Sequence, residues 1–451
     1  MQLAAYGAQD IYLTGNPQIT FFKFVYRRHT NFSMETIEQS FDGTVGFEKE
    51  VSCILKRKAD LVHKMYLKFN IHTTNIIYHD SGMCANLGSA IIDQIDLEIG
   101  GQLIDRHYGH WLEVYANLTE PHNGTSRARV TYPKNNSGDL IQGSKFQNMS
   151  WMGGVEGYRL IAGTTTPYAY VPFRFWFCRH PGLALPLIAL QYHEVKVRVK
   201  FQKETYCLVD GSGSNTESAG TITLNANLMA NYIFLDTDER RRFAQEKHEY
   251  LIEQLQFIDS SLYDSTGSNN ISRHPLYFNH PVKELIWTGG VTLQNVKTVK
   301  KGDEWINGTT GGSSSTRNGH ERGPSTPATD ASGSMSASGL KDTTYKLEIN
   351  GNDLFEARKR DYFTRAQIWM YHSGSGGLDC DHDVNSQTGD SIAVYSFALK
   401  PQEYQPSGTC NFSRIKNSYL VMGTAGPLYI YAVNYNILRI MSGMAGLVYT
   451  N

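Results

Sequence analysis

The sequence predicts an all-β protein made of two antiparallel β-sandwiches in tandem, with short helices and long loops between the strands. Two observations carry this prediction: apolar and polar residues alternate with a period of two, and short motifs of the first half return in the same order in the second half. A third observation argues against a parallel α/β fold, because no helix long enough to join parallel strands separates the alternating segments.

Alternation is clearest in Lys64–His72 and Glu194–Phe201, where apolar side chains occupy every second position and charged or polar side chains lie between them. Ile95–Ile99 and Phe173–Phe177 follow the same pattern and are also predicted as strands. One buried face and one solvent-facing face is typical of antiparallel sheets, since parallel sheets are covered on both faces. We therefore expect antiparallel sandwiches.

Internal repetition indicates how many domains there are. Four motifs recur in order: Ile37–Phe41 as Ile252–Phe257, Leu61–Leu67 as Pro281–Trp287, Leu97–Gly101 as Leu347–Gly351, and Asn231-Tyr232 as Asn434-Tyr435. One such match is weak, whereas four in the same order indicate a duplication. We predict an N-terminal arm of residues 1–33, a first domain of residues 34–237 and a second domain of residues 238–451.

The third motif has a backbone explanation. Gly100-Gly101 and Asn350-Gly351 each follow an alternating strand, and both pairs tolerate the positive φ angles of a two-residue hairpin turn. Different residues therefore meet the same backbone requirement at equivalent places in the two domains.

A short helical joint is predicted at residues 238–247, where the second domain begins. Asp236 is a candidate N-cap, and Glu239 lies three residues later, as in a capping box. The acidic residues of the first turn, Asp238 and Glu239, also complement the helix dipole. The next strand is expected at Tyr250–Phe257.

Composition limits the classes of function. Charged residues make up 19% of the 451 residues and their net charge is -1, which argues against direct nucleic-acid binding. The six cysteines are scattered without a C-x-x-C pair, so we expect free thiols in a reducing compartment. We expect no signal peptide and no membrane span, and a protein that is soluble when made.

Two long insertions, residues 116–165 and 303–343, are predicted as exposed loops, and the second is rich in Gly, Ser and Thr. Exposed loops are the segments in which glycans and receptor contacts are expected. The loop sequons that are candidates for glycosylation are Asn123, Asn135, Asn148 and Asn307.

The N-terminal arm mixes aromatic and cationic residues. Its candidates for an assembly contact on an inner surface are Phe21, Phe22, Tyr26, Arg27 and Arg28. Two interpretations stay open: the arm packs on its own domain, or it reaches a neighbouring subunit or an anionic surface beneath.

The sequence contains no catalytic signature. It lacks a P-loop, an H-E-x-x-H zinc motif and a G-x-S-x-G nucleophile elbow. Asp379–Asp383 is the one local cluster of metal-ligand type, but it lacks the glycine and the final glutamate of a calcium loop, so a solvated acidic loop is favoured. We predict no catalytic residue, no metal and no cofactor.

Several blocks of the chain together resemble one family. They are Gly7–Lys23, Tyr26–Phe32, Pro181–Val195, Ala230–Phe257, Gln405–Ile415 and Asn434–Gly446. These blocks run from one end of the chain to the other. They closely resemble the major capsid proteins of nucleocytoplasmic large DNA viruses, in particular the algal chlorovirus and mimivirus-related branch. Departures from the family pattern are concentrated in the predicted loops.

The resemblance implies a double jelly roll, that is, two eight-stranded sandwiches standing roughly perpendicular to a shell. It also implies a homotrimer whose six similar domains form a pseudo-hexagonal capsomer, which tiles an outer icosahedral shell together with neighbouring capsomers. Minor capsid proteins and an internal membrane would lie beneath, on the side of the arm, and loop 303–343 would face outward, where it could meet a host receptor. The expected location is the virion, after synthesis and assembly in the host cytoplasm.

Other functions fit the same fold. A jelly-roll lectin or receptor-binding protein would hold its ligand in the loops, and a glycan array would distinguish it. A related membrane-scaffolding protein would be absent from mature virions. An enzyme ranks last, because a jelly roll implies no activity and no convergent acid–base set is present.

Overall fold

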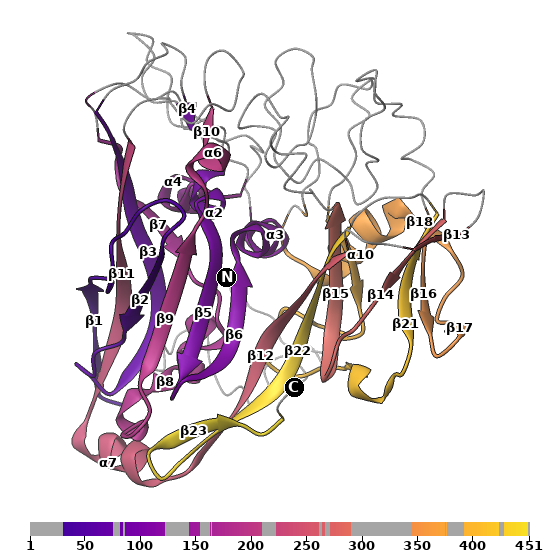
Figure 1. Ribbon diagram of the computed structural model, residues 1–451. Helices are drawn as coiled ribbons and strands as arrows, with labels where there is room; N and C mark the ends of the chain where they lie inside the picture. Colours follow the sequence, from indigo (N-terminus) through magenta and orange to yellow (C-terminus); the bar gives the residue numbers. More distant parts are fainter. Residues whose placement is uncertain are drawn as a thin grey trace, which may run out of the picture.

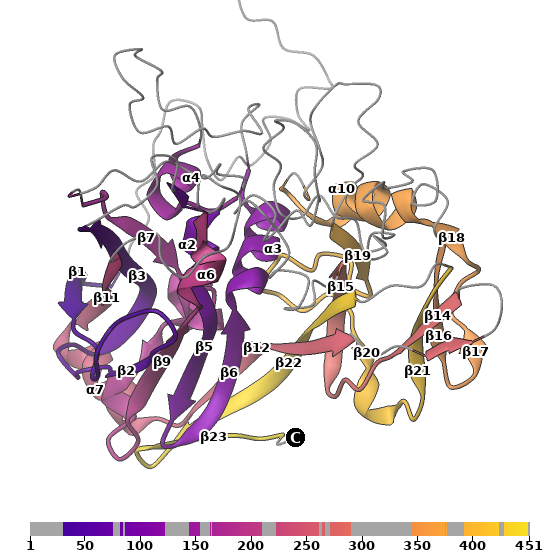
Figure 2. The same ribbon diagram turned by 45° about the horizontal axis from the view of Figure 1, so that its top comes forward.

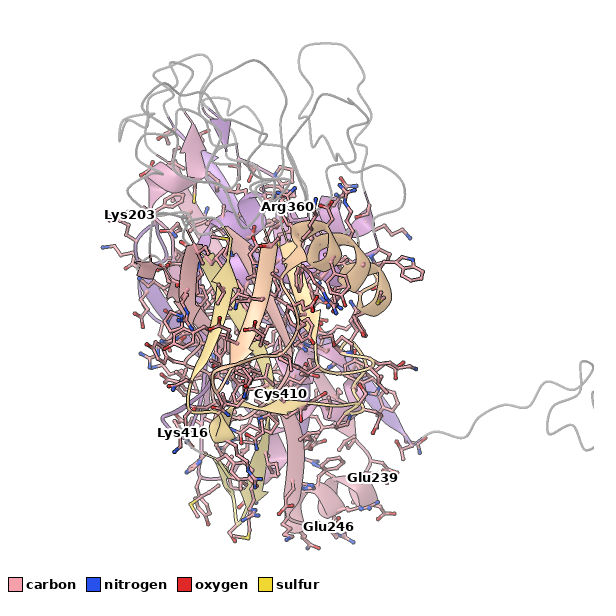
Figure 3. All side chains as sticks on the ribbon, turned by 90° about the vertical axis from the view of Figure 1, so that its right-hand side faces the viewer. Lys203, Glu239, Glu246, Arg360, Cys410 and Lys416 are labelled. Carbon is pink, nitrogen blue, oxygen red and sulfur yellow. The ribbon has the colours of Figure 1, made fainter. Side chains whose placement is uncertain are left out.

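A computed structural model describes residues 30–74, 82–83, 86–121, 144–153, 163, 165–209, 222–260, 264–266, 271–289, 344–374, 376, 392–423 and 428–449. Within these residues the chain forms two β-sandwiches that lie side by side, the first built from β1 to β11 and the second from β12 to β23 (Figure 1). Figure 3 shows Lys203 and Arg360 toward one end of the molecule and Glu239 and Glu246 at the other.

The first sandwich has two sheets with four principal strands each. One sheet has the order β1-β11-β3-β7, and the other has the order β2-β9-β5-β6. Their bounds are β1 Phe32–Gln39, β2 Glu50–Ile54, β3 Leu61–Thr73, β5 Ile92–Ile99, β6 Gln102–Tyr108, β7 Ala169–Pro172, β9 Val195–Phe201 and β11 Ile222–Leu235. Short strands β8 (Leu185–Pro186), which pairs with β3, and the pair β4 (Gly82–Met83) and β10 (Leu208–Val209) complete it.

The second sandwich repeats this arrangement. Its sheets have the orders β12-β22-β15-β19 and β14-β21-β16-β17. Their bounds are β12 His248–Ser260, β14 Ile271–Pro275, β15 Pro281–Gly289, β16 Thr344–Ile349, β17 Asn352–Asp353, β19 Ile392–Ser396, β21 Ser418–Met422 and β22 Leu428–Met441. The short strands are β13 Asp264–Thr266, β18 Arg358–Lys359, β20 Cys410–Asn411 and β23 Met444–Leu447.

The two sandwiches share one topology. If the principal strands of each sandwich are numbered in chain order, both sandwiches have the sheets 1-8-3-6 and 2-7-4-5. The strand pairs are antiparallel. This is the arrangement of a jelly roll, so the predicted fold class of two tandem antiparallel jelly rolls is confirmed.

The repeated motifs of the sequence fall on equivalent strands. The pairs are β1 with β12, β3 with β15, the β5–β6 hairpin with the β16–β17 hairpin, and β11 with β22. Both hairpins turn on two residues with positive φ: Gly100 and Gly101 at 58° and 80°, and Asn350 and Gly351 at 50° and 82°. The turn chemistry predicted from the sequence is therefore confirmed in both copies.

The helices are short and lie between strands. They are α2 Leu87–Ala90, α3 Gly109–Thr119, α4 Lys145–Ser150, α5 Trp176–Arg179, α6 Glu204–Cys207, α7 Thr237–Gln245 and α10 Gln367–Tyr371, with 3-10 turns η1 Pro181–Leu183, η2 Leu187–Ala189 and η5 Phe412–Arg414 and the π-helical turn η4 Tyr362–Ala366. The expectation that residues 116–165 form a loop is wrong in part. The end of α3 and the whole of α4 lie within that range.

The strand expected at Phe173–Phe177 is also wrong. Strand β7 ends at Pro172, and Trp176–Arg179 forms helix α5. Trp176 is as buried as Phe175 and Phe177. The alternation fails at Trp176, which is buried where a half-buried strand would present a solvent-facing residue, and period alone cannot decide so short an apolar run.

Helix α7 leads from the first sandwich into the second. Asp236 is its N-cap, as predicted, but its carboxylate accepts from the amide of Thr237 at 2.7 Å instead of the Glu239 amide that a capping box requires, so that part of the prediction is wrong. Strand β12 follows at His248. At the N-terminal end of the first sandwich, β1 begins at Phe32, two residues before the expected start of the first domain. Among the described residues, no helix is long and apolar enough to cross a membrane.

Candidate functional site at the junction of the two sandwiches

Most of the site residues predicted from sequence lie outside the described residues. These are Phe21, Phe22, Tyr26, Arg27 and Arg28 of the arm, the sequon residues Asn123, Asn135 and Asn307, and the acidic cluster Asp379–Asp383. Where the chain is described, no group of three or more His, Cys, Asp or Glu side chains is placed to hold a metal.

Asn148 is described, and the prediction that it lies in a loop is wrong. It lies on helix α4 and is half-buried. The serine of its sequon, Ser150, is buried and donates a hydrogen bond to the Phe146 carbonyl at 2.8 Å. A helical, half-buried asparagine is a poorer glycan acceptor than one in an exposed loop, because attachment needs an accessible amide.

Among the described residues, an apolar cluster, hydrogen bonds and buried ion pairs occur together where the two sandwiches meet. Helix α3, which follows β6 of the first sandwich, lies between them (Figure 2). Its buried side chains Trp111, Val114 and Leu118 pack against residues of β15, β19 and β22. The second-sandwich residues of this cluster are Ile286, Ile368, Ile392, Val394, Tyr431 and Val433.

The sheet β12-β22-β15-β19 is consequently buried on both faces. Leu285 and Trp287 face the core of the second sandwich, whereas Ile286 between them faces α3. In β22, Ile430 likewise faces the core of the second sandwich, and Tyr431 faces α3. An antiparallel sheet with two apolar faces must be covered on both, so this sheet cannot stand in water without its partner.

The N-terminal half of α3 is held by the first sandwich. Glu113 is buried and accepts hydrogen bonds from Ser89 Oγ at 2.9 Å and from the Gly153 amide at 2.8 Å. His110 faces the other way, with Nδ1 2.9 Å from Tyr431 Oη of β22. Burial lowers the pKa of His110 to about 4, so it is neutral at physiological pH.

A buried ionic cluster joins the sandwiches beside α3. Glu253 of β12 forms ion pairs with Arg179 of the first sandwich and, at 2.7 Å, with Lys283 of β15. Next to it, Glu284 lies 3.0 Å from His372 Nε2. The exposed fractions of these side chains range from 2% to 11%. Buried charges of this kind must be paired, so the cluster requires both sandwiches in one relative position.

The charges in the cluster stabilise one another. Burial would raise the pKa of Glu284, but the facing His372, Lys283 and Arg179 hold that pKa below its usual value. Burial would likewise lower the pKa of Arg179, whereas Tyr115 and Glu253 keep it above its usual value. The Glu284 carboxylate is therefore ionised in the folded protein at neutral pH.

Hydrogen bonds between backbone and side-chain groups extend the junction along β6 and β12. The amide of Leu255 donates to Asp105 at 3.0 Å, and Gln254 donates to the carbonyl of Ile104. Beyond this point Ile252 belongs to the apolar core of the first sandwich, as do Leu438 of β22 and Ala445 of β23. The second domain thus supplies part of the core of the first.

No motif of the sequence predicted this junction. The available signal was the run Leu428–Val433, in which both faces of a strand are apolar although the neighbouring strands alternate. Such a run predicts a sheet that is covered on both faces, but it does not identify the element that covers the second face. The partners Arg179 and Glu253 are 74 residues apart, and no local pattern relates them.

Outside the junction, several large apolar side chains are exposed. Trp369 is 83% exposed, Tyr277 80%, Leu399 77% and Tyr192 75%. Single exposed apolar residues are common, but side chains of this size are also enriched in contacts between subunits. The four described cysteines are free, and Cys53, Cys178 and Cys207 are buried.

Comparison with known proteins relates this architecture to a family. Two family models match the chain: the major capsid protein N-terminus over residues 20–236 and the large eukaryotic DNA virus major capsid protein over residues 239–446. The chain is 42% identical to the major capsid protein of Pyramimonas orientalis virus, over 100% of this chain and 99% of the relative. It is 37% identical to that of Paramecium bursaria Chlorella virus 1, with the same coverage.

Solved structures agree with the sequence relatives. The quasi-atomic model of the PBCV-1 virus capsid matches with a TM-score of 0.69 and 33% identity, covering 96% of this chain and 100% of that chain. The match therefore includes both sandwiches and not one jelly roll alone. By these matches the chain belongs to the major capsid protein family of large eukaryotic DNA viruses.

Proposed function

We propose that this major capsid protein forms homotrimers, and that each trimer is a pseudo-hexagonal capsomer that tiles the outer icosahedral shell of a large DNA virus. One observation carries the proposal: two sandwiches of identical strand order lie side by side in one chain. Three such chains around a threefold axis present six similar wedges, and a nearly sixfold outline paves a surface evenly.

The junction supports this function because tiling needs a fixed shape. Helix α3 and the cluster around Glu253 hold the two sandwiches against each other through apolar packing and paired charges. The protein acts by its shape, without turnover. No cofactor and no direct contact with nucleic acid are needed for this role.

Further partners follow from the resemblance and stay proposals. Neighbouring capsomers would contact the sides of the trimer, where exposed side chains such as Trp369 and Leu399 are candidates. Minor capsid proteins and an internal membrane would lie beneath, on the side of the arm of residues 1–33. The outer loops, including residues 303–343, would face the host and could bind a receptor. The protein would be synthesised and assembled in the host cytoplasm before it enters the virion.

The lectin, receptor-binding and scaffolding alternatives find no support in the family relationship, since the relatives named above are major capsid proteins. No feature of the described residues favours a sugar site over a shell contact.

Native mass spectrometry of the purified full-length protein, followed by electron microscopy of purified particles, tests the proposal. We expect trimers and a lattice of pseudo-hexagonal blocks. A species that stays monomeric at high concentration would contradict it. Deletion of residues 1–25 should leave trimers that no longer form normal shells, and normal shells from that variant would exclude an assembly role for the arm.

A further inference from the structure

Helix α3 ends in a cap that the other sandwich provides. The last four carbonyl groups of a helix have no partner within the helix, and buried ones must find partners elsewhere. In α3 these are the carbonyls of residues 116–119. That of Ala116 accepts from the amide of Glu120 at 2.9 Å, within the first sandwich.

Among the described residues, the three remaining carbonyls accept hydrogen bonds from the second sandwich only. The Gly376 amide donates to Asn117 O at 2.9 Å, and the Gly374 amide donates to Leu118 O at 2.8 Å. Ser373 Oγ donates to Thr119 O at 2.9 Å. Residues 372–374 and Gly376 of the second sandwich therefore supply the hydrogen-bond partners for the end of a helix that begins in the first.

Gln402 ties these residues to the ionic cluster. Its Nε2 donates to Leu118 O at 3.0 Å and to His372 Nδ1 at 3.1 Å, which uses both amide hydrogens. On the other side of the same ring, His372 Nε2 lies 3.0 Å from Glu284. A chain of polar contacts runs from the carboxylate on β15 to the last turn of α3.

Two glycines allow the backbones to approach this closely. A Cβ at Gly374 would lie 2.2 Å from Asn117 O, and a Cβ at Gly109, at the start of α3, would lie 2.1 Å from the Ile92 carbonyl oxygen. No side chain fits at either place without movement of the backbone. The N-terminal end of α3 therefore packs closely on the first sandwich at Gly109, and its C-terminal end packs closely on Gly374 of the second sandwich.

We propose that residues 372–374 and Gly376, together with Gln402, form a clamp on the C-terminal end of α3, and that this clamp sets the angle between the two sandwiches. The inference rests on the proposed function, in which that angle decides whether trimers tile. Gly374 and Gln402 are positioning residues, because they act through α3.

Hydrogen exchange of the full-length protein tests the clamp directly. Gly374→Ala should separate the two backbones sterically, and Gln402→Ala should remove both side-chain hydrogen bonds of Gln402 without adding bulk. In both variants the amides of residues 372–374 and Gly376 should exchange about tenfold faster or more, while those of β3 and β16 keep their protection. Matched controls are Gly46→Ala, where a Cβ would meet only the Lys49 side chain at 3.6 Å, and Gln405→Ala, an exposed glutamine three residues away.

Assembly provides the second measurement. Variants with an opened clamp should still form trimers, but fewer of these should close into regular shells than in the two controls. Unchanged exchange in both variants would overturn the clamp, and faster exchange with normal shells would overturn its role in setting the angle. Wild-type protein that does not trimerise would instead refute the proposed function, with the exchange results still deciding whether the clamp exists.

Discussion

Replacing Glu253 by Gln should destabilise the protein strongly, because this carboxylate pairs with two buried cations. Arg179, Glu253 and Lys283 are 11%, 11% and 3% exposed, so water cannot replace the lost charge. Removing one partner of a buried ion pair costs about 3–5 kcal/mol. Lys283 keeps its bond to the Pro401 carbonyl at 2.6 Å and Arg179 keeps its bond to the Arg174 carbonyl at 2.9 Å. Because these contacts remain, we expect the free energy of unfolding to fall by an amount near the lower limit, about 3 kcal/mol.

Thermal unfolding measured by calorimetry, with denaturant titration, is the assay. For a cooperative unit of about 200 residues, the loss corresponds to a fall in Tm of about 6–12 °C. The matched control is Glu249→Gln on the same strand, where Glu249 and Arg439 are 3.0 Å apart but 43% and 49% exposed. An exposed pair contributes about 0–1 kcal/mol, so the control should shift Tm little.

Equal falls in Tm for Glu253→Gln and Glu249→Gln would refute the reasoning, because a buried ion pair would then contribute no more to stability than an exposed one. A double-mutant cycle sharpens the comparison. In a Lys283→Met background one of the two cations is gone, so Glu253→Gln should cost about 1 kcal/mol less than in the wild type. An additive result would show that Lys283 and Glu253 do not interact energetically.

Three further predictions concern pH, a turn and a thiol. The pKa of Glu284 is held below its usual value, so its stabilising contribution is present above about pH 4.5 and is lost as the pH falls through the lowered pKa. Denaturant titrations from pH 7 to pH 3 should show a steeper loss for wild type than for Glu284→Gln, and parallel curves would contradict this. Gly351 has φ 82°, so Gly351→Ala should cost about 1 kcal/mol or more in the same titration, and no change would mean that the turn adapts. Burial raises the pKa of Cys53 to about 11, so under native conditions a thiol reagent should label it far more slowly than the half-buried Cys410, and equal rates would contradict this.

The predictions differ in which level of structure they test. Gly351→Ala tests a local backbone requirement, and Cys53 tests the core of one sandwich. Glu253, Glu284 and the clamp of residues 372–374, Gly376 and Gln402 test contacts that exist only when both sandwiches are together. Loss of the second group of contacts with retention of the first would place the defect at the junction and not within either sandwich.

Some errors of the sequence analysis have a common physical cause. Phe173–Phe177 was expected to be a strand, but Trp176 is buried at the start of α5, where the alternation requires a solvent-facing residue. Residues 116–165 were expected to be a loop, yet α3 and α4 enter that range because their buried faces find partners elsewhere in the chain. Asn148 was misplaced for the same reason. Tertiary burial overrides local pattern in each case.

The sequence by itself determined the strands, the hairpin turns and the duplication, because these depend on alternation over a few residues and on which residues tolerate positive φ. Leu97–Gly101 and Leu347–Gly351 specify the same hairpin wherever they occur in a chain. Only the tertiary structure decided how the two copies meet. The junction joins Arg179 to Glu253 and the end of α3 to Gly374, residues that are far apart in sequence and whose burial and pairing exist only once both sandwiches have folded against each other.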